Sequence, residues 1–265
     1  MKLLCPICRE ELTWQEKLCR CEAGHSFDVA RQGYVNLLPV QQKHSLHPGA
    51  TREQVLARRA FLDTGAYRPL LEQLQQILAR HNAQGPILDV GCGEGYYSSA
   101  IARALGAELV GLDISKEAVR VAAGRHKDAR WVCATASRLP VADGQVGLLM
   151  SMFALTLPEE FGRAVARDGL FLQVTAREDH LLGMKSVIYP KLTEKEKTPE
   201  ASIPGFTLVE QQDVVFDLHL QGQQVQNLLC MTPHLYRISR EGLQRLQDLD
   251  TLRDRACCRV RLYKK

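Results

Sequence analysis

The chain has 265 residues, of which 45% are hydrophobic and 24% charged, and its formal net charge is +4. This is the composition of an ordinary globular protein, and the charge permits an anionic partner without requiring one. No apolar run reaches the roughly 20 residues of a membrane span, and the first residues are too short in apolar length for a signal peptide. We therefore expect a cytoplasmic protein without membrane contact, whose nine cysteines are metal ligands or buried thiols.

The first 36 residues contain two pairs of metal-binding residue types. Cys5 and Cys8 form one pair, and twelve residues later Cys21 and His25 form the second. Two such turns, facing one another, supply the tetrahedral ligand set that structural zinc prefers. Cys19 competes with Cys21, but the two lie too close in sequence to chelate one ion well. We predict structural Zn²⁺ held by Cys5, Cys8, Cys21 and His25.

Residues 37–84 are expected to join this zinc module to a larger domain. Residues 41–50 are polar and aperiodic, which favours a loop, either a solvated linker or a flap that contacts RNA. Thr51 is a suitable N-cap for a helix over 51–63, and apolar spacing predicts a second helix over 67–79. Tyr67 stands near the break between the two helices, where core packing alone does not explain it.

The run ILDVGCGEGYY, from residue 87, predicts a strand, a tight turn and a helix. Asp89 lies near the end of the strand, and Gly91, Gly93 and Gly95 follow at alternate positions. This unit opens nucleotide-binding α/β sheets, and glycines let a ligand lie against the main chain. The G-x-G-x-G spacing lacks the dinucleotide pattern and the P-loop lysine. The next strand-like run ends in Asp113, where a carboxylate usually holds ribose hydroxyls.

Strand and helix patterns alternate beyond this turn. This alternation predicts a parallel, doubly wound sheet that binds its ligand at the carboxyl ends of the strands. Strands are expected at 86–90, 108–112, 130–134, 146–152 and 169–175, and helices at 97–105, 115–125 and 158–167. Further on, helices are expected at 179–188, 221–230 and 239–249, and an antiparallel edge hairpin from 207–218 and 257–263. The chain divides into a zinc module over 1–36, a linker with two helices over 37–84, and an α/β domain over 85–265.

The glycine run resembles motif I of class I S-adenosylmethionine (SAM) methyltransferases, which have a Rossmann-like, mostly parallel sheet. Several runs occur together in one order: CPIC, CEAGHSFD, GYVNLLPVQ, ARRAFLDTGAY, ILDVGCGEGYY, GLDIS and RLPVADG. Their combination, over residues 1 to about 235, resembles the zinc-containing large-subunit ribosomal RNA (guanine-N1)-methyltransferases. The resemblance implies SAM-dependent methylation of guanine N1 in 23S rRNA, in a base flipped from a hairpin loop.

The same resemblance implies roles for individual residues. Tyr67, Gly93, Glu94 and His180 would contact SAM, beside the Asp89, Gly91, Gly95 and Asp113 of the motif. From the neighbouring sequence alone, we would expect His180 on the surface of a helix. The zinc module would help to hold RNA through basic side chains, and a homodimer is one arrangement that the sequence allows. The candidate basic residues are Lys2, Arg9, Lys17, Arg20, Arg31, Lys43, Arg52, Arg58 and Arg59.

Three stretches depart from the pattern of the family. Gly147 replaces an Asp at the start of the fourth strand, residues 167–170 replace a Lys-Pro-Gly-Gly turn, and residues 151–154 are less polar than usual. We expect all three on the substrate side, which leaves the substrate less certain than SAM. The sequence identifies no general base.

Other chemistries fit the sequence less well. No Asp/Asn-Pro-Pro-aromatic run supports exocyclic amine methylation. Cys92 and Cys133 lack the Pro-Cys context of a cytosine-C5 nucleophile, and they read as packed thiols. Two alternatives stay open: a SAM-dependent methyltransferase of small molecules, and a SAM-binding RNA-binding protein that has lost catalysis.

Overall fold

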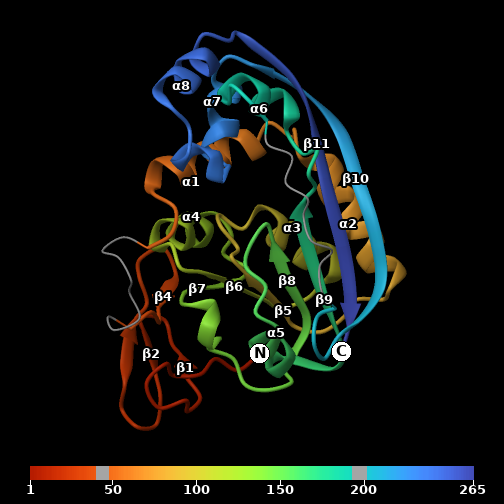
Figure 1. The fold of residues 1–265 in the computed structure, drawn as a ribbon. Coiled ribbons are helices and arrows are strands. Elements are labelled where there is room, and N and C mark those ends of the chain that lie inside the picture. Colours follow the sequence, from red (N-terminus) through yellow and green to blue (C-terminus); the bar gives the residue numbers. More distant parts are fainter. Residues whose placement is uncertain (40–47, 193–201) are drawn as a thin grey trace.

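The structure, a computed structural model, describes residues 1–39, 48–192 and 202–265. Most of the loop expected at 41–50 therefore lies outside the described residues. A central eight-stranded sheet runs in the order β10-β11-β9-β8-β5-β6-β7-β4 (Figure 1). Its strands from β4 to β9 are parallel, and β11 and β10 add an antiparallel edge. The bounds are β4 Tyr34–Asn36, β5 Ile87–Val90, β6 Leu109–Asp113, β7 Arg130–Cys133, β8 Val146–Met152, β9 Val165–Ala176, β10 Thr207–Gln221 and β11 Thr251–Lys264.

The central strands are almost wholly apolar because both faces of the sheet are covered. Ile87 and Leu109 pack into the core on one face, and Leu88 and Val110 into the core on the other. Helices α2 (Arg68–Arg80), α3 (Tyr96–Leu105) and α4 (Lys116–Arg125) contribute to the first core, and α5 (Pro158–Ala164) contributes to the second. The predicted Rossmann-like, mostly parallel sheet with helices on both faces is thereby confirmed.

The zinc module packs directly on the second face of the sheet. Its own small antiparallel sheet consists of β1 (Thr13–Trp14), β2 (Leu18–Arg20) and β3 (Ser26–Asp28). Leu3 and Leu12 are buried in the same core as Leu88, and β4 pairs in parallel with β7. The domain division at residue 36 stays a prediction, but β4, within the predicted module, is one of the two edge strands of the main sheet.

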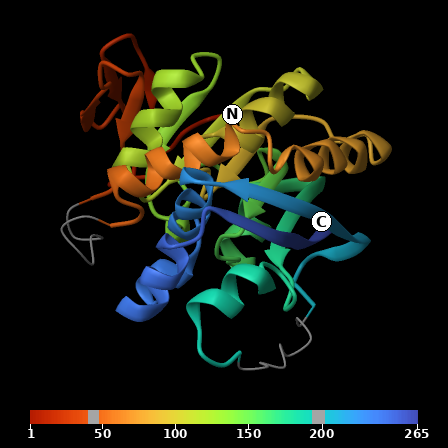
Figure 2. The same cartoon turned by 90° about the horizontal axis from the view of Figure 1, so that it is seen from above.

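A group of helices lies beyond the carboxyl ends of β8 and β9 (Figure 1). It consists of α1 (Arg52–Leu62), α6 (Leu182–Ile188), α7 (Gln223–Cys230) and α8 (Arg240–Gln247). Thr51 caps α1 as predicted, with a capping box to Gln54. Seen from above, α1 and α2 lie on one side of the β10-β11 hairpin and α6 lies on the other (Figure 2). Among the described residues, no helix has the length and apolar character to cross a membrane.

Two predicted helices are shorter than expected. The helix expected over 158–167 ends at Ala164, because β9 begins at Val165 and pairs with β8. The helix expected over 179–188 begins at Leu182, since Leu181 has a left-handed φ of 57° that interrupts the helix. The segment that was expected to hold one or two strands is a single strand, β10.

Candidate functional site

The glycine loop lies between β5 and α3, at the carboxyl edge of the parallel strands. The backbone N–H of Gly93 donates to Asp113 Oδ2 at 2.9 Å, and Ser115 N–H donates to Asp113 Oδ1 at 2.8 Å. Asp113 therefore joins the loop to the ends of β6 and α4. A carboxylate has about four acceptor sites, so Asp113 can accept from a further donor.

The three glycines of the loop have positive φ angles, 82° at Gly91, 57° at Gly93 and 81° at Gly95. A β-carbon at Gly91 would lie 2.8 Å from Ala154 Cβ, and one at Gly95 would lie 2.5 Å from the Trp131 ring. Close packing against the protein therefore also requires a bare main chain at these two positions.

Gly93 faces a side chain that the sequence did not connect with the loop. A β-carbon there would lie 3.0 Å from Arg58 Nη1, so the guanidinium of α1 lies over the loop. The sequence groups Arg58 with the basic residues expected near RNA, but this position is at the carboxyl edge of the sheet. No spacing rule connects α1 to the glycine turn, and only the fold brings them together.

Asp89 lies beneath the loop and is almost fully buried, at 3% exposure. Its Oδ1 has no hydrogen-bond partner among the described residues. Burial, together with the nearby Asp113 carboxylate, raises the pKa of Asp89 to about 7. A buried carboxylate with one unpaired oxygen next to the loop suits a ligand that carries a positive charge.

Glu94 is also buried, and its side chain points to a protein partner. Its Oε2 accepts a hydrogen bond from Arg125 Nη1 at 3.1 Å, and Arg125 also pairs with Asp63 at the end of α1. Burial raises the pKa of Glu94, and Arg125 opposes this shift. The described side-chain contacts of Glu94 thus connect the loop to α4 and α1, while its Oε1 is unpaired.

Tyr67 and His180 both lie near β11, where Cys258 is close to each of them. Tyr67, at the start of α2, is buried, and its ring packs edge-on against Phe61 and Phe216. Burial, with the Cys258 thiol nearby, raises the pKa of Tyr67. His180 Nδ1 lies 3.0 Å from the backbone N of Cys257 and 4.0 Å from Cys258 Sγ. His180 is in a turn before α6, not in a surface helix as its surroundings suggested.

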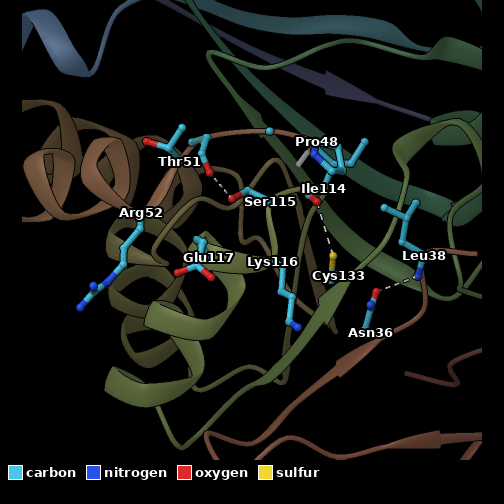
Figure 3. Close-up of a pocket in the computed structure, with 12 residues that line it drawn as sticks. Asn36, Leu38, Pro48, Thr51, Arg52, Ile114, Ser115, Lys116, Glu117 and Cys133 are labelled. Atoms are coloured by element: carbon cyan, nitrogen blue, oxygen red, sulfur yellow. Dashed lines mark hydrogen bonds between the residues drawn. The ribbon is translucent and has the colours of Figure 1, made fainter. Parts of the chain in front are cut away.

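A cavity of about 310 Å³ opens beside Ile114 and Ser115, the two residues that follow Asp113 in the chain (Figure 3). Ile114 and Cys133 form part of its wall at the ends of β6 and β7, and Leu38 also lines it. Ser115 Oγ donates to the Ala50 carbonyl at 2.6 Å and so holds the start of α1 at the rim. The lining residues are Asn36, Leu38, Pro48, Gly49, Ala50, Thr51, Arg52, Ile114, Ser115, Lys116, Glu117 and Cys133.

Two of the three departures from the family pattern do not lie on the substrate side, so that prediction was wrong. Gly147 is at the amino end of β8, opposite the ligand-binding edge, and its N–H donates to the Pro86 carbonyl. A β-carbon there would lie 2.2 Å from the Gln84 carbonyl oxygen, which leaves no room for an Asp. Residues 167–170 likewise lie in the amino-terminal part of β9. Only residues 151–154 are at the carboxyl edge.

The structure brings Cys5, Cys8, Cys21 and His25 together, with one ligand atom of each within 4.8 Å of the others. Cys8 Sγ lies 3.6 Å from Cys21 Sγ, and His25 Nδ1 lies 3.4 Å from Cys21 Sγ. These separations suit a tetrahedral zinc ion with bonds of about 2.0–2.3 Å. Cys19 is buried and does not belong to the cluster.

The basic residues of the first 60 positions differ in their contacts. Arg9 donates to the Leu139 carbonyl at 3.0 Å and Lys2 pairs with Glu11, so both contribute to the structure. Lys17, Arg20 and Arg31 are exposed and form no ion pair with any residue that the structure describes. Arg59 pairs with Asp63, Arg52 is exposed, and Lys43 lies outside the described residues.

Comparisons with known proteins connect both parts of the chain to described families. Residues 3–46 match the family described as RlmA, N-terminal, and residues 87–168 match a methyltransferase domain. The 23S rRNA (guanine(748)-N(1))-methyltransferase of Streptomyces fradiae is 34% identical over 92% of this chain and 89% of its own. YxjB of Bacillus subtilis, provisionally named a 23S rRNA (guanine-N(1)-)-methyltransferase, is 27% identical over 92% of this chain and 90% of its own. A solved structure of phosphoethanolamine N-methyltransferase 2 from Haemonchus contortus, in complex with S-adenosyl-L-methionine, covers 81% of this chain and 57% of that chain at 16% identity and a TM-score of 0.48.

Proposed function

Because the chain belongs to the 23S rRNA (guanine-N1)-methyltransferases, we propose that it transfers a methyl group from SAM to N1 of a guanine in 23S rRNA. The observation that carries this proposal is that the glycine-loop site and the zinc site belong to parts of the chain that share one hydrophobic core. The glycine loop and Asp113 lie at the carboxyl edge of the sheet, and the zinc module packs on one of its faces. A small-molecule methyltransferase has no evident use for the second site.

Three features support SAM as the ligand of the loop. SAM carries an ammonium group and a sulfonium, and the unpaired carboxylate oxygen of Asp89 suits a positive charge. Asp113 has lone pairs for ribose hydroxyls, and the cavity that begins at Ile114 has room for the adenine. Gly91, Gly93, Glu94 and Gly95 would contact the methionine part through their main chain. Tyr67 and His180 would close the other end of the site.

Zinc would be held by Cys5, Cys8, Cys21 and His25, with no position open for a substrate. The ion would fix the two turns that carry its ligands. We propose that the exposed Lys17, Arg20 and Arg31 contact RNA phosphates, which would give binding that weakens as salt rises. A cytoplasmic location fits the substrate, and the homodimer stays a prediction.

SAM supplies an activated methyl group, which moves to N1 of guanine as the bond to sulfur breaks. N1 carries a proton that must leave for a base or for solvent, so the product is a neutral N1-methylguanine. The protein contributes mainly by aligning donor and acceptor and by excluding water. The base must also leave its stack to reach the edge of the sheet, which favours a target in a loop.

Primer extension on 23S rRNA tests the proposal. N1 methylation removes the donor that pairs with cytosine, so reverse transcriptase should stop one nucleotide before the modified guanine. We expect a single new stop, and transfer of one labelled methyl group, after unmethylated 23S rRNA is incubated with the protein and SAM. The proposal fails if SAM binds but no stop and no label appear on 23S rRNA, which is the result expected of a protein that has lost catalysis.

A further inference from the structure

We propose that Phe153 is the surface on which the target base stacks during methyl transfer. This assignment rests on the function proposed above. Phe153 follows directly after the last residue of β8, at the carboxyl edge where the donor site lies. Phe153 is 45% exposed, although it is one of the larger apolar residues of the protein.

The position of Phe153 is next to the donor site. The following residue, Ala154, packs on the glycine loop, because a β-carbon at Gly91 would lie 2.8 Å from Ala154 Cβ. The Phe153 ring lies 6.2 Å from the ring of His180, with an angle of 35° between the planes. A base stacked on Phe153 would therefore lie close to the loop that we assign to SAM.

The backbone of Phe153 is strained. Its φ is +53°, a left-handed conformation that is unusual for a bulky side chain. Strain of this kind persists only where the surroundings enforce it, and it is frequent at functional sites. The exposed ring does not compensate for it by burial in the core.

Hydrogen bonds on both sides hold the strained residue in place. Phe153 N–H donates to the Val174 carbonyl at 2.8 Å, and Ser151 Oγ donates to the Leu155 carbonyl at 3.1 Å. Gln173 Nε2 donates to Thr156 Oγ1 at 2.8 Å. The segment 151–156 is thus fixed to β9, and it presents a rigid aromatic ring at the surface.

A planar base is the occupant that these features favour. Aromatic rings hold unstacked bases by stacking, and alanine substitution of such rings weakens binding of one base by about 5- to 150-fold. The ring has no charge or hydrogen-bonding group of its own, so it would orient the plane of the base without identifying it. This agrees with a role in positioning N1 toward the methyl group.

Methylation of 23S rRNA by Phe153→Ala, Phe153→Gly and Phe153→Trp variants tests the assignment. For the alanine and glycine variants we expect the single-turnover rate at saturating RNA to fall about 5- to 150-fold. The RNA concentration at half-saturation and the SAM dissociation constant should stay within about twofold, because the stack forms only with the extruded base. Tryptophan should restore most of the rate. Val215→Ala, on the edge strand β10 with a similar exposure of 46%, is the matched control.

Thermal unfolding separates this role from a structural one. Glycine tolerates the left-handed backbone, so Phe153→Gly should unfold at a temperature no lower than the wild type while its activity falls. The assignment is overturned if the wild type methylates 23S rRNA and Phe153→Ala does so at an equal rate. It is also overturned if the variants lose SAM binding in proportion to activity. If the wild type transfers no methyl group to 23S rRNA, the proposed function itself fails, and this assignment fails with it.

Discussion

Gly93 and Asp113 are joined by a 2.9 Å hydrogen bond from the glycine loop to the carboxylate at the end of the neighbouring strand. Asp113 therefore fixes the loop, and in the function proposed above it would also offer acceptors to a bound nucleoside. Asp113→Asn keeps the size of the side chain but removes its charge. Hydrogen bonds to charged groups contribute about 1.5–3 kcal/mol, so the SAM dissociation constant should rise about 10- to 150-fold in calorimetry. Asp128→Asn, at an exposed ion pair with Arg103, should leave it unchanged.

The affinity for SAM should depend on pH through Asp89. Burial raises the pKa of Asp89 to about 7, so the group is mostly protonated at pH 6 and mostly ionised at pH 8. The positive charge of SAM favours the ionised form. Affinity should therefore increase by up to about tenfold from pH 6 to pH 8. In Asp89→Asn this increase should disappear, leaving only the titration of SAM itself. Equal pH dependence in the two proteins would contradict the role given to Asp89.

Stability in mild acid should depend on His126. Burial, with Arg125 nearby, lowers the pKa of His126 to about 4, whereas an unfolded histidine titrates near 6.5. The native state thus holds the neutral form, and this contribution is fully present above about pH 6.5. It is lost as the pH falls toward 4, and it amounts to about 2–3 kcal/mol. Urea unfolding of His126→Gln should show a smaller loss between these pH values. His219→Gln, at an exposed site, should behave as the wild type.

Removal of a zinc ligand should affect more than the zinc module. Cys8→Ser should lower the zinc content below one ion per chain, measured by metal analysis. Because Leu3 and Leu12 share a core with the main sheet, we also expect the unfolding temperature to fall by about 5 °C or more. Cys19→Ala removes a buried thiol outside the cluster and should keep the full zinc content. A wild-type metal content in Cys8→Ser would exclude the ligand set.

Gly147 should matter for packing and not for the substrate. A β-carbon at this position would lie 2.2 Å from the Gln84 carbonyl oxygen, so Gly147→Ala should lower the free energy of unfolding by about 2–3 kcal/mol. Its folded fraction should bind SAM as tightly as the wild type. Gly124→Ala, in α4 with open space around it, should be neutral or slightly stabilising. Altered SAM binding in Gly147→Ala would instead support a position for Gly147 on the substrate side.

Much of the fold could be predicted from the sequence, because its signals are local. The apolar runs around Ile87 and Leu109 are strands within a residue of their predicted ends, and Thr51 and Ser115 cap helices as expected. The C-x₂-C pair and Cys21 with His25 likewise depend on short spacings. In contrast, β4 is only three residues long and acquires its role from pairing with β7.

The site was less predictable because its contacts join distant segments. Arg58 over Gly93, and Arg125 beside Glu94, come from helices that the glycine motif does not specify. The strained φ of Phe153 has no signal in the residue type, since it is imposed by the bonds around it. The prediction for Gly147 was wrong because a departure from a family pattern does not tell which end of a strand the residue occupies.

The pairing of β4 with β7 has a consequence for how a target would be selected. Since the zinc module is anchored to the sheet by backbone hydrogen bonds and by a shared core, it cannot move independently as a domain on a flexible linker would. If RNA phosphates bind to the zinc module as proposed above, the fold sets their distance from the methyl donor. Such an enzyme would select its substrate by this distance. It would not methylate a loop of the correct sequence that is held at a different distance from its stem.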